Sequence, residues 1–325
     1  MRADLLHVVT TISNPVRYSS RYRLYERFVQ QMFQAGVTLT TVELTYGDRP
    51  SMVRKVLEKV GNCAPASARH RHVHLRTRTE LWHKENLVDI GVAHLPADAE
   101  YIAWIDADVT FQRPNWAAET VHSLQTYDVV QMFSQALDLS PEFEVAPPPR
   151  VVTSFLASYE MGATSANGRY DDHLWHPGYA WAMRRSAYRA VGGLIDFAVL
   201  GAGDRHMAMA LVGKADASMP RDICSGYRQR VLAWQELAEE HVQHNVGYVT
   251  GLITHGWHGR KRQRGYHDRW KILVEQQYDP TTDIKYDPTT GLLDWSHMRS
   301  DRMRRLRNQV RYYFRSRNED SIDVD

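Results

Sequence analysis

The chain has 325 residues, of which 43% are hydrophobic, and its formal net charge at pH 7 is only +2. Such a chain can bury a sizeable core, so the protein is expected to be globular rather than disordered. Two cysteines, Cys63 and Cys224, exclude a disulfide framework and a cysteine zinc cluster. The N-terminus does not resemble a signal peptide and no stretch approaches the roughly 20 apolar residues that cross a bilayer, so we expect a soluble, cytoplasmic protein without a membrane partner.

The first third of the sequence alternates between strand and helix patterns. Strand patterns cover residues 4–12, 38–46, 101–105 and 128–133, and helix patterns cover 20–34, 81–95 and a segment that begins at Pro114. This order predicts an α/β protein with a mainly parallel central sheet flanked by helices.

The rest of the chain is less regular. The pattern weakens from 134 to 170, where "APPPR" at 146–150 marks a loop. Beyond it we expect strands at 178–184 and 246–259, helices at 203–213 and 224–242, and a basic helix near the C-terminus. No clear domain boundary is visible.

Positive charge is concentrated in three clusters. They are "RHRHVHLRTR" at 69–78, "HGRKRQRGYHDRWK" at 258–271, and the segment 299–317, which has eight arginines and one acid, Asp301. Arginine interleaved with aromatic residues suits polyanion binding, whereas a solvated amphipathic helix is the simpler interpretation of any single cluster.

The segment "YIAWIDADVTF" places Asp106 and Asp108 directly after a buried strand. Alternate residues of an extended chain point the same way, so both carboxylates can lie at the carboxyl end of the strand, where open α/β sheets bind ligands. Paired like charges require compensation, and hard oxygen ligands suit Mn²⁺ or Mg²⁺. A turn in which the two acids cap main-chain amides is the alternative.

Two histidines, His255 and His258, end a later strand pattern in "THGWHG". Imidazole suits Mn²⁺ better than Mg²⁺, so either histidine is a candidate third ligand. Gly256 and Gly259 allow the main chain to pass close to a ligand.

Asp204 follows a Gly-Ala-Gly turn at the start of a helix pattern. It is expected to be an N-cap, a role for which aspartate is preferred, and it can also take a proton from an attacking hydroxyl.

Two further segments carry candidate binding residues. "HPGYAWAMRR" places His176, Tyr179 and Trp181 at the start of a strand, where they form either core or a stacking platform. The loop after the first strand holds Ser13, Asn14 and Arg17, which can contact a nucleotide or form a plain turn. The sequence has no dinucleotide-binding glycine fingerprint and no P-loop.

Together, the "DAD" motif, the glycine turn with an acid and the strand ending in histidine resemble the GT-A fold nucleotide-diphosphosugar glycosyltransferases over most of residues 4–273. The resemblance implies a UDP-sugar donor, a metal ion held by Asp106, Asp108 and His255 or His258, and a catalytic base at Asp204. Such enzymes often carry a Glu-Asp pair at the base position, where this chain has Gly203-Asp204. The implied donor-side residues are Thr11, Ser13, Asn14, Arg17, Glu43, Lys84 and Asp106.

The resemblance also implies a domain organisation. A catalytic domain would span 1–278, with a nucleotide-sugar half to about 133 and an acceptor half at 134–278, and 279–325 would form an extension with the arginine-rich helix.

A narrower likeness involves "NPVRYSSRYRLYERF", "TVELTYGDRP", "HPGYAWAMRR" and "HGRKRQRGYHDRW". These segments resemble phage glycosyltransferase-like proteins and the base J glucosyltransferase. The likeness implies UDP-glucose or a similar donor, a hydroxymethylated pyrimidine in double-stranded DNA as acceptor, and a bacterial or phage-infected cell. The implied acceptor-binding residues are His176, Tyr179, Trp181, Trp257, Arg260 and Arg264. A polysaccharide or protein acceptor, or a non-catalytic nucleic-acid-binding protein, are the alternatives.

Overall fold

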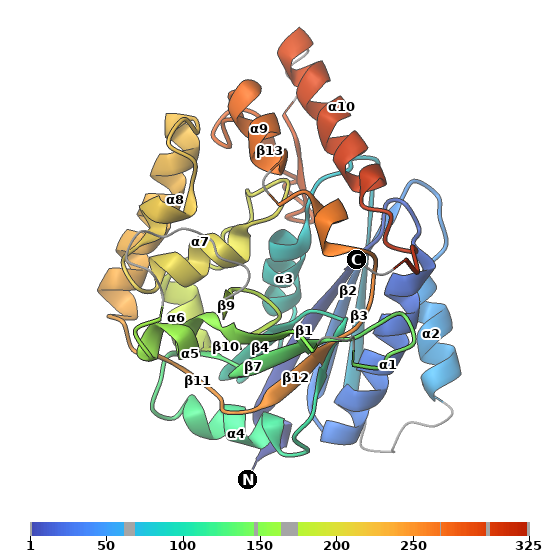
Figure 1. Cartoon of the computed structure of the whole chain (residues 1–325), viewed down its shortest axis with the longest axis vertical. Coiled ribbons are helices and arrows are strands. Elements are labelled where there is room, and N and C mark those ends of the chain that lie inside the picture. The colour runs from blue at the N-terminus through green and yellow to red at the C-terminus, as the bar shows by residue number, and fades with distance from the viewer. Residues whose placement is uncertain are drawn as a thin grey trace.

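The computed structural model describes residues 2–61, 69–145, 149–163, 175–266, 268–296 and 300–323. Cys63, residues 146–148 of the proline-rich loop and Arg299 lie outside these ranges. Within them the chain forms an α/β fold around a central sheet, with helices on both faces (Figure 1).

The central sheet has seven strands in the order β11-β6-β10-β4-β1-β2-β3. Every neighbouring pair is parallel except those of β10, which runs antiparallel to both β4 and β6. The strands are β1 (Leu6–Ser13), β2 (Thr38–Tyr46), β3 (Arg69–Thr77), β4 (Tyr101–Ile105), β6 (Val129–Gln131), β10 (Ala180–Arg184) and β11 (Val246–Tyr248). The α/β class and the mainly parallel sheet predicted from the sequence are therefore confirmed.

Strand alternation divides the core between the two faces of this sheet. In β4, Ile102 and Trp104 join the cluster that contains helices α3, α6, α7 and α8, whereas Ala103 and Ile105 join the cluster of α1, α2 and α4. The helices are α1 (Ser19–Ala35), α2 (Met52–Gly61), α3 (Lys84–Ala93), α4 (Trp116–Ser123), α5 (Phe155–Glu160), α6 (Arg185–Ala190), α7 (Gly203–Ala210) and α8 (Ser225–His241).

A second sheet of five strands lies beside the carboxyl end of β4. Its order is β5-β12-β7-β8-β9, formed by β5 (Val109–Phe111), β12 (Leu252–His255), β7 (Gln135–Asp138), β8 (Val151–Ser154) and β9 (Trp175–His176). Asp106 and Asp108 lie in the link from β4 to β5, and β5 pairs with β12 so that Val109 is opposite His255. This register brings the acid motif and the histidine motif together.

The single strand expected at 246–259 is wrong. Residues 246–248 form β11 in the central sheet and 252–255 form β12 in the second sheet. The break comes at Gly251, whose carbonyl oxygen accepts hydrogen bonds from the main-chain amides of Ser134 and Gln135 and thereby directs the chain onto β7.

The C-terminal part packs onto the same core. It contains α9 (Asp268–Glu275), the hairpin of β13 (Ile284–Tyr286) and β14 (Leu293–Trp295), and α10 (Asp301–Ser316). Met303, Leu306 and Val310 of α10 are fully buried at helical spacing. No helix in the described ranges combines the length and apolar character that spanning a membrane requires.

Most arginines of α10 and of the residue after it bind groups of the protein. Arg302 pairs with Asp283, and Arg311 and Arg315 both pair with Glu80. Arg307 donates to the carbonyl of Ser296, and Arg317 pairs with Glu319. The inner and lateral faces of the helix therefore mainly stabilise the packing of the C-terminal part against the rest of the protein.

Candidate active site and metal centre

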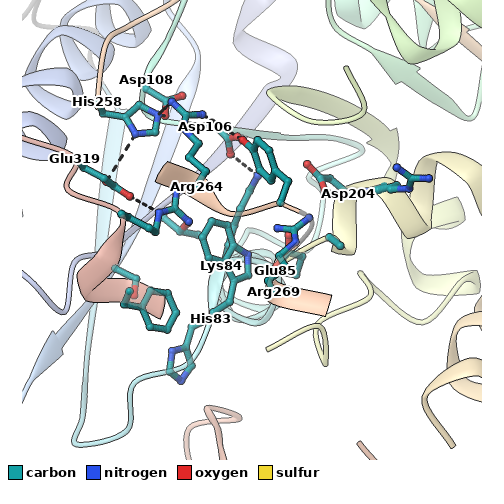
Figure 2. A pocket seen from close by; sticks show the side chains of 18 of the residues that line it. His83, Lys84, Glu85, Asp106, Asp108, Asp204, His258, Arg264, Arg269 and Glu319 are labelled. Carbon is teal, nitrogen blue, oxygen red and sulfur yellow. Dashed lines mark hydrogen bonds and ion pairs between the residues drawn. The ribbon is translucent and has the colours of Figure 1, made fainter. Parts of the chain in front are cut away.

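A cavity of about 530 Å³ lies where the two sheets meet. Its walls come from the end of β1, the start of α3, the Asp106–Asp108 link, the residues before β10, the start of α7, the end of β12 and the C-terminal residues. Figure 2 shows Asp108 and His258 on one side, with Asp204 on the other and Lys84 and Asp106 in between. The cavity thus lies at the carboxyl end of the sheet, where the strand positions predicted a ligand site.

Asp108, His255 and His258 form a compact group at one end of this cavity. Their ligand atoms lie within 4.8 Å of one another. The Oδ2 atom of Asp108 is 3.0 Å from Nε2 of His258 and 3.8 Å from Nε2 of His255, and the two Nε2 atoms are 3.2 Å apart. Both histidines, between which the sequence analysis left the choice open, therefore belong to the group.

The hydrogen-bonding chemistry of this group fits a divalent cation. Nδ1 of His255 is 3.0 Å from a carboxylate oxygen of Asp138, so Nδ1 carries the proton and Nε2 directs a lone pair at the group. Nε2 of His258 is 3.0 Å from Asp108 and 3.1 Å from a guanidinium nitrogen of Arg264. This nitrogen cannot donate a hydrogen bond to Asp108 and accept one from Arg264 at the same time. A cation, in contrast, is bound by lone pairs of Asp108, His255 and His258 together.

Two further observations support a cation here. Oδ1 of Asp108 is buried without a hydrogen-bond partner, which is costly for a carboxylate oxygen. Burial alone would raise the pKa of Asp108, but His255 and His258 outweigh it and hold the pKa below its usual value. Asp108 is therefore an ionised carboxylate, the form that coordinates Mn²⁺ or Mg²⁺.

Asp106 lies outside this group. Its Oδ1 atom is 2.5 Å from the ammonium of Lys84, the first residue of α3. Burial would lower the pKa of Lys84, but Asp106, Glu85 and Asp204 together raise it, so the side chain is a cation. The expected ligand Asp106 thus forms an ion pair with the expected donor-side residue Lys84.

Asp204 lines the opposite end of the cavity, but it is not the N-cap of α7. That position belongs to Ala202, whose φ of 91° is left-handed, and Asp204 lies in the first turn instead. Its Oδ1 atom accepts a hydrogen bond of 2.8 Å from the amide of Arg205. A Cβ atom at Gly178 would overlap the Asp204 carboxylate, so a glycine is required opposite it.

Trp181 does not line the large cavity. It is 1% exposed and its Nε1 donates to the carbonyl of Pro177. Tyr179 has a φ of 76°, which breaks the alternation, so Tyr179 and Trp181 belong to opposite core clusters although they are two residues apart. Tyr179 lines the cavity together with His176, and their rings stack with centroids 3.7 Å apart.

Glu43 and Arg17 also differ from the expectation. The Glu43 carboxylate is 2% exposed and accepts hydrogen bonds from the amides of Met52 and Val53 at the start of α2. It therefore acts as a helix cap. Neither Glu43 nor Arg17 lines the large cavity, whereas the other five residues expected on the donor side do: Thr11, Ser13, Asn14, Lys84 and Asp106.

Among the expected acceptor-side residues, Trp257 and Arg260 bind the C-terminal segment instead. Nε1 of Trp257 donates to the carbonyl of Ser321, and Nε of Arg260 donates to that of Asp323. Arg264 does line the cavity and is 6% exposed.

Several cavity residues were not predicted from the sequence. Glu319 and Arg317 come from the C-terminal segment, and Arg21 comes from α1. No sequence signal links these positions. Glu85 and Arg205 lie directly beside the predicted Lys84 and Asp204, and Trp82 lies two residues before Lys84. Arg269 and Trp270 belong to the basic cluster at 258–271.

No protein-family model and no curated protein matches the chain. Among solved structures, one similar protein is the mannosyltransferase PcManGT from Pyrobaculum calidifontis in complex with GDP-Man and Mn²⁺, with 15% identity and a TM-score of 0.45 over 84% of this chain and 61% of that chain. Another is TarS 1–349 of S. aureus with UDP-GlcNAc, with 9% identity and a TM-score of 0.42 over 83% and 64%. The catalytic domain of Drosophila β1,4-galactosyltransferase 7 with xylobiose has 13% identity and a TM-score of 0.38 over 87% and 84%. The chain spans less than two thirds of the first two proteins.

Proposed function

We propose that the protein is a metal-dependent, inverting glycosyltransferase that moves a sugar from a UDP-sugar, such as UDP-glucose, to the hydroxyl of a hydroxymethylated pyrimidine in double-stranded DNA. The observation that carries the proposal is the Asp108, His255 and His258 group, which shares one cavity with Lys84 and Asp204.

On the donor side, Asp108, His255 and His258 would hold Mn²⁺. A divalent ion there neutralises a diphosphate leaving group. The Lys84 ammonium adds positive charge beside this group, and the buried Arg264 guanidinium lies 3.1 Å from His258. Cations in a shielded cavity stabilise the charge that develops as the bond to the diphosphate breaks.

On the acceptor side, Asp204 takes the proton of the attacking hydroxyl. The acceptor oxygen forms a bond to the anomeric carbon while the bond between that carbon and the diphosphate oxygen breaks. Asp204 and the metal-binding group lie on opposite sides of the cavity (Figure 2), which suits attack from the face opposite the leaving group and hence inversion.

The acceptor end contains groups that suit a nucleobase and its phosphates. Trp270, whose ring packs against His206 of α7, offers an aromatic surface, and Arg205, next to Asp204, and Arg269 supply positive charge to the cavity. Stacking and phosphate contacts are the usual means of binding an exposed nucleotide. On the outer face of α10, Tyr312 is 72% exposed, and Arg305 of the same helix is also exposed.

One observation favours an oligosaccharide or protein acceptor instead. Of the seven arginines at 302–317, six bind groups of the protein, so α10 presents less unpaired positive charge than its sequence indicated. Phosphate contacts dominate the affinity of DNA-binding proteins, so a weakly basic surface suits a neutral acceptor.

The test is nucleoside mass spectrometry after the protein is incubated with Mn²⁺, a panel of nucleotide-sugars, and duplex DNA that contains hydroxymethyluracil or hydroxymethylcytosine. We expect a hexosylated nucleoside with one donor only. Transfer to an oligosaccharide but not to modified DNA would contradict the DNA acceptor. Absence of any Mn²⁺-dependent release of nucleotide from every donor would contradict the enzyme.

A further inference from the structure

The C-terminal segment 317–323 reaches the metal-binding group from a distant part of the sequence. Its Glu319 side chain is 1% exposed, and Oε2 of Glu319 lies 3.7 Å from Nδ1 of His258. Figure 2 shows Glu319 and Asp108 on opposite sides of the His258 ring. Nε2 of this histidine is the atom that faces Asp108 and His255.

The two histidines of the group have equivalent surroundings. His255 has Asp138 behind its Nδ1 atom at 3.0 Å, and Asp138 is in turn 2.5 Å from the ammonium of Lys261. His258 has Glu319 behind its Nδ1 atom, and Glu319 is in turn paired with arginines. Carboxylates that accept a hydrogen bond from the far nitrogen of a ligating histidine fix its tautomer and orientation.

Glu319 is paired with two arginines. Nη2 of Arg21 is 2.7 Å from Oε1 of Glu319, and Nε of Arg317 is 2.7 Å from the same oxygen. The carboxylate that these arginines hold in place therefore faces Nδ1 of His258, which has no hydrogen-bond partner at its present distance.

The main-chain conformation allows segment 317–323 to lie close to His258. Gly259, next to His258, has a φ of 81°, and a Cβ atom there would lie 2.8 Å from the carbonyl oxygen of Asn318 and 2.9 Å from Cα of Glu319. The carboxylate of Asp320 accepts hydrogen bonds of 2.8 Å from the amides of Ser19 and Ser20 at the start of α1. These contacts fix the segment against both the metal-binding loop and α1.

We propose that Glu319 is a positioning residue for His258, which makes the C-terminal segment 317–323 part of the metal site. This inference rests on the metal-dependent function proposed above. It gives the C-terminal segment a role in metal binding, which was not expected of the extension at 279–325. Metal binding and ordering of the C-terminal segment are consequently coupled, and each strengthens the other.

The first experiment measures the affinity for Mn²⁺ alone, by electron paramagnetic resonance titration of the full chain. Glu319→Gln is expected to weaken Mn²⁺ binding about tenfold to a hundredfold, because it removes the charge that orients His258. The matched control is Glu275→Gln, the same change at an exposed glutamate of α9 that does not line the cavity, and it should bind Mn²⁺ within about twofold of the unaltered chain.

The second experiment does not depend on a variant of Glu319 that folds. Hydrogen exchange of the unaltered chain is followed with and without saturating Mn²⁺. The amides of Asn318 and Ser321, which donate to Tyr18 and to the Asn318 carbonyl, should exchange more slowly with the metal. In Asp108→Asn, Mn²⁺ should leave their exchange unchanged.

The outcomes separate this inference from the function on which it rests. If the unaltered chain binds Mn²⁺ but Glu319→Gln binds equally well, or the metal leaves the exchange of Asn318 and Ser321 unchanged, the positioning role is overturned and the metal site stands. If the unaltered chain does not bind Mn²⁺ at all, the metal-dependent function itself is overturned.

Discussion

The two ends of the cavity are constructed differently. At the metal end, each histidine has a carboxylate behind it, and each carboxylate is paired with a cation. At the acceptor end, the Asp204 carboxylate accepts a main-chain amide hydrogen bond and the neighbouring walls include the aromatic Trp270. A network of charges fixes the first end before any ligand arrives, whereas the second end offers surface for a flat acceptor. The donor is therefore expected to bind by preorganised electrostatics and the acceptor by stacking.

The largest effect is expected at the metal end. Asp108→Asn keeps the shape of the side chain but removes the ligand charge, and metal ions contribute several kcal/mol to the transition state in such reactions, so transfer should fall about a thousandfold or more. Mn²⁺-dependent release of UDP from the UDP-sugar measures it. Asp138→Asn, which only loosens His255, should lose less, about tenfold to a hundredfold. Equal activity in Asp108→Asn and the unaltered chain would show that the group is not the metal site.

A second variant separates the ends. Asp204→Asn removes the proposed proton acceptor and should lower kcat about a hundredfold to a thousandfold, the range that general base catalysis contributes. Its affinity for Mn²⁺ should not change, because Asp204 lies across the cavity from the metal-binding group. Steady-state kinetics with the accepting substrate, together with Mn²⁺ titration, test both statements. A parallel loss of Mn²⁺ affinity would mean that the two ends are not independent.

The stacking surface should have a smaller effect that is confined to the acceptor. Trp270→Leu keeps an apolar side chain against its buried neighbours His206 and Tyr227 while it removes the indole face. Loss of one stacked base costs about 1–3 kcal/mol, so KM for the acceptor should rise about tenfold while KM for the donor stays the same. A changed donor KM with an unchanged acceptor KM would reverse the assignment of the two ends.

Glu85, which lies between the two ends, gives a prediction on stability. It is 5% exposed, its Oε2 atom has no hydrogen-bond partner, and burial followed by the charge of Asp204 raises its pKa from 4.5 to about 8, although Lys84 opposes the shift. The folded state keeps the proton that the unfolded state releases, so stability due to this group is full below pH 4.5 and falls as pH rises toward 8, by up to about 1.4 kcal/mol per pH unit.

Glu85→Gln removes this titration. Urea unfolding at a series of pH values should show a flatter dependence between pH 4.5 and 8 in the variant than in the unaltered chain. Identical slopes in the two proteins would show that Glu85 is ionised in the folded state and finds a partner there.

Local sequence patterns predicted the parts of the fold and site that depend on local order. The alternation of strand and helix segments predicted the mainly parallel sheet, and the position of Asp108 after β4 predicted its place at the edge of the sheet where the cavity lies. The register between β5 and β12 could not be predicted, yet it is what places His255 beside Asp108. Sequence order alone does not determine the pairing of strands that are more than a hundred residues apart.

Other parts depended on contacts that no local pattern records. Glu319 meets Arg21 across 298 residues, so their ion pair has no signal in either segment. Trp181 was expected at the start of a strand, either as core or as part of a stacking platform with Tyr179, and the positive φ of Tyr179 places the two side chains in different core clusters. Glu43 was expected to contact the donor and instead caps α2, because its carboxylate accepts hydrogen bonds from the main-chain amides at the start of that helix.

The reversed direction of β10 changes which residues a strand contributes to the site. Parallel strands such as β1 and β4 supply the residues that follow them, whereas β10 enters the sheet from the edge where the cavity lies and supplies His176 and Tyr179, which precede it. The main-chain carbonyl of Tyr179 accepts a hydrogen bond of 2.8 Å from the amide of Asp106, so the chain on its way into β10 and the chain on its way out of β4 meet at this point. Any lengthening or shortening of the connection before β10 is therefore expected to move Asp106 before it changes the packing at the far edge of the sheet.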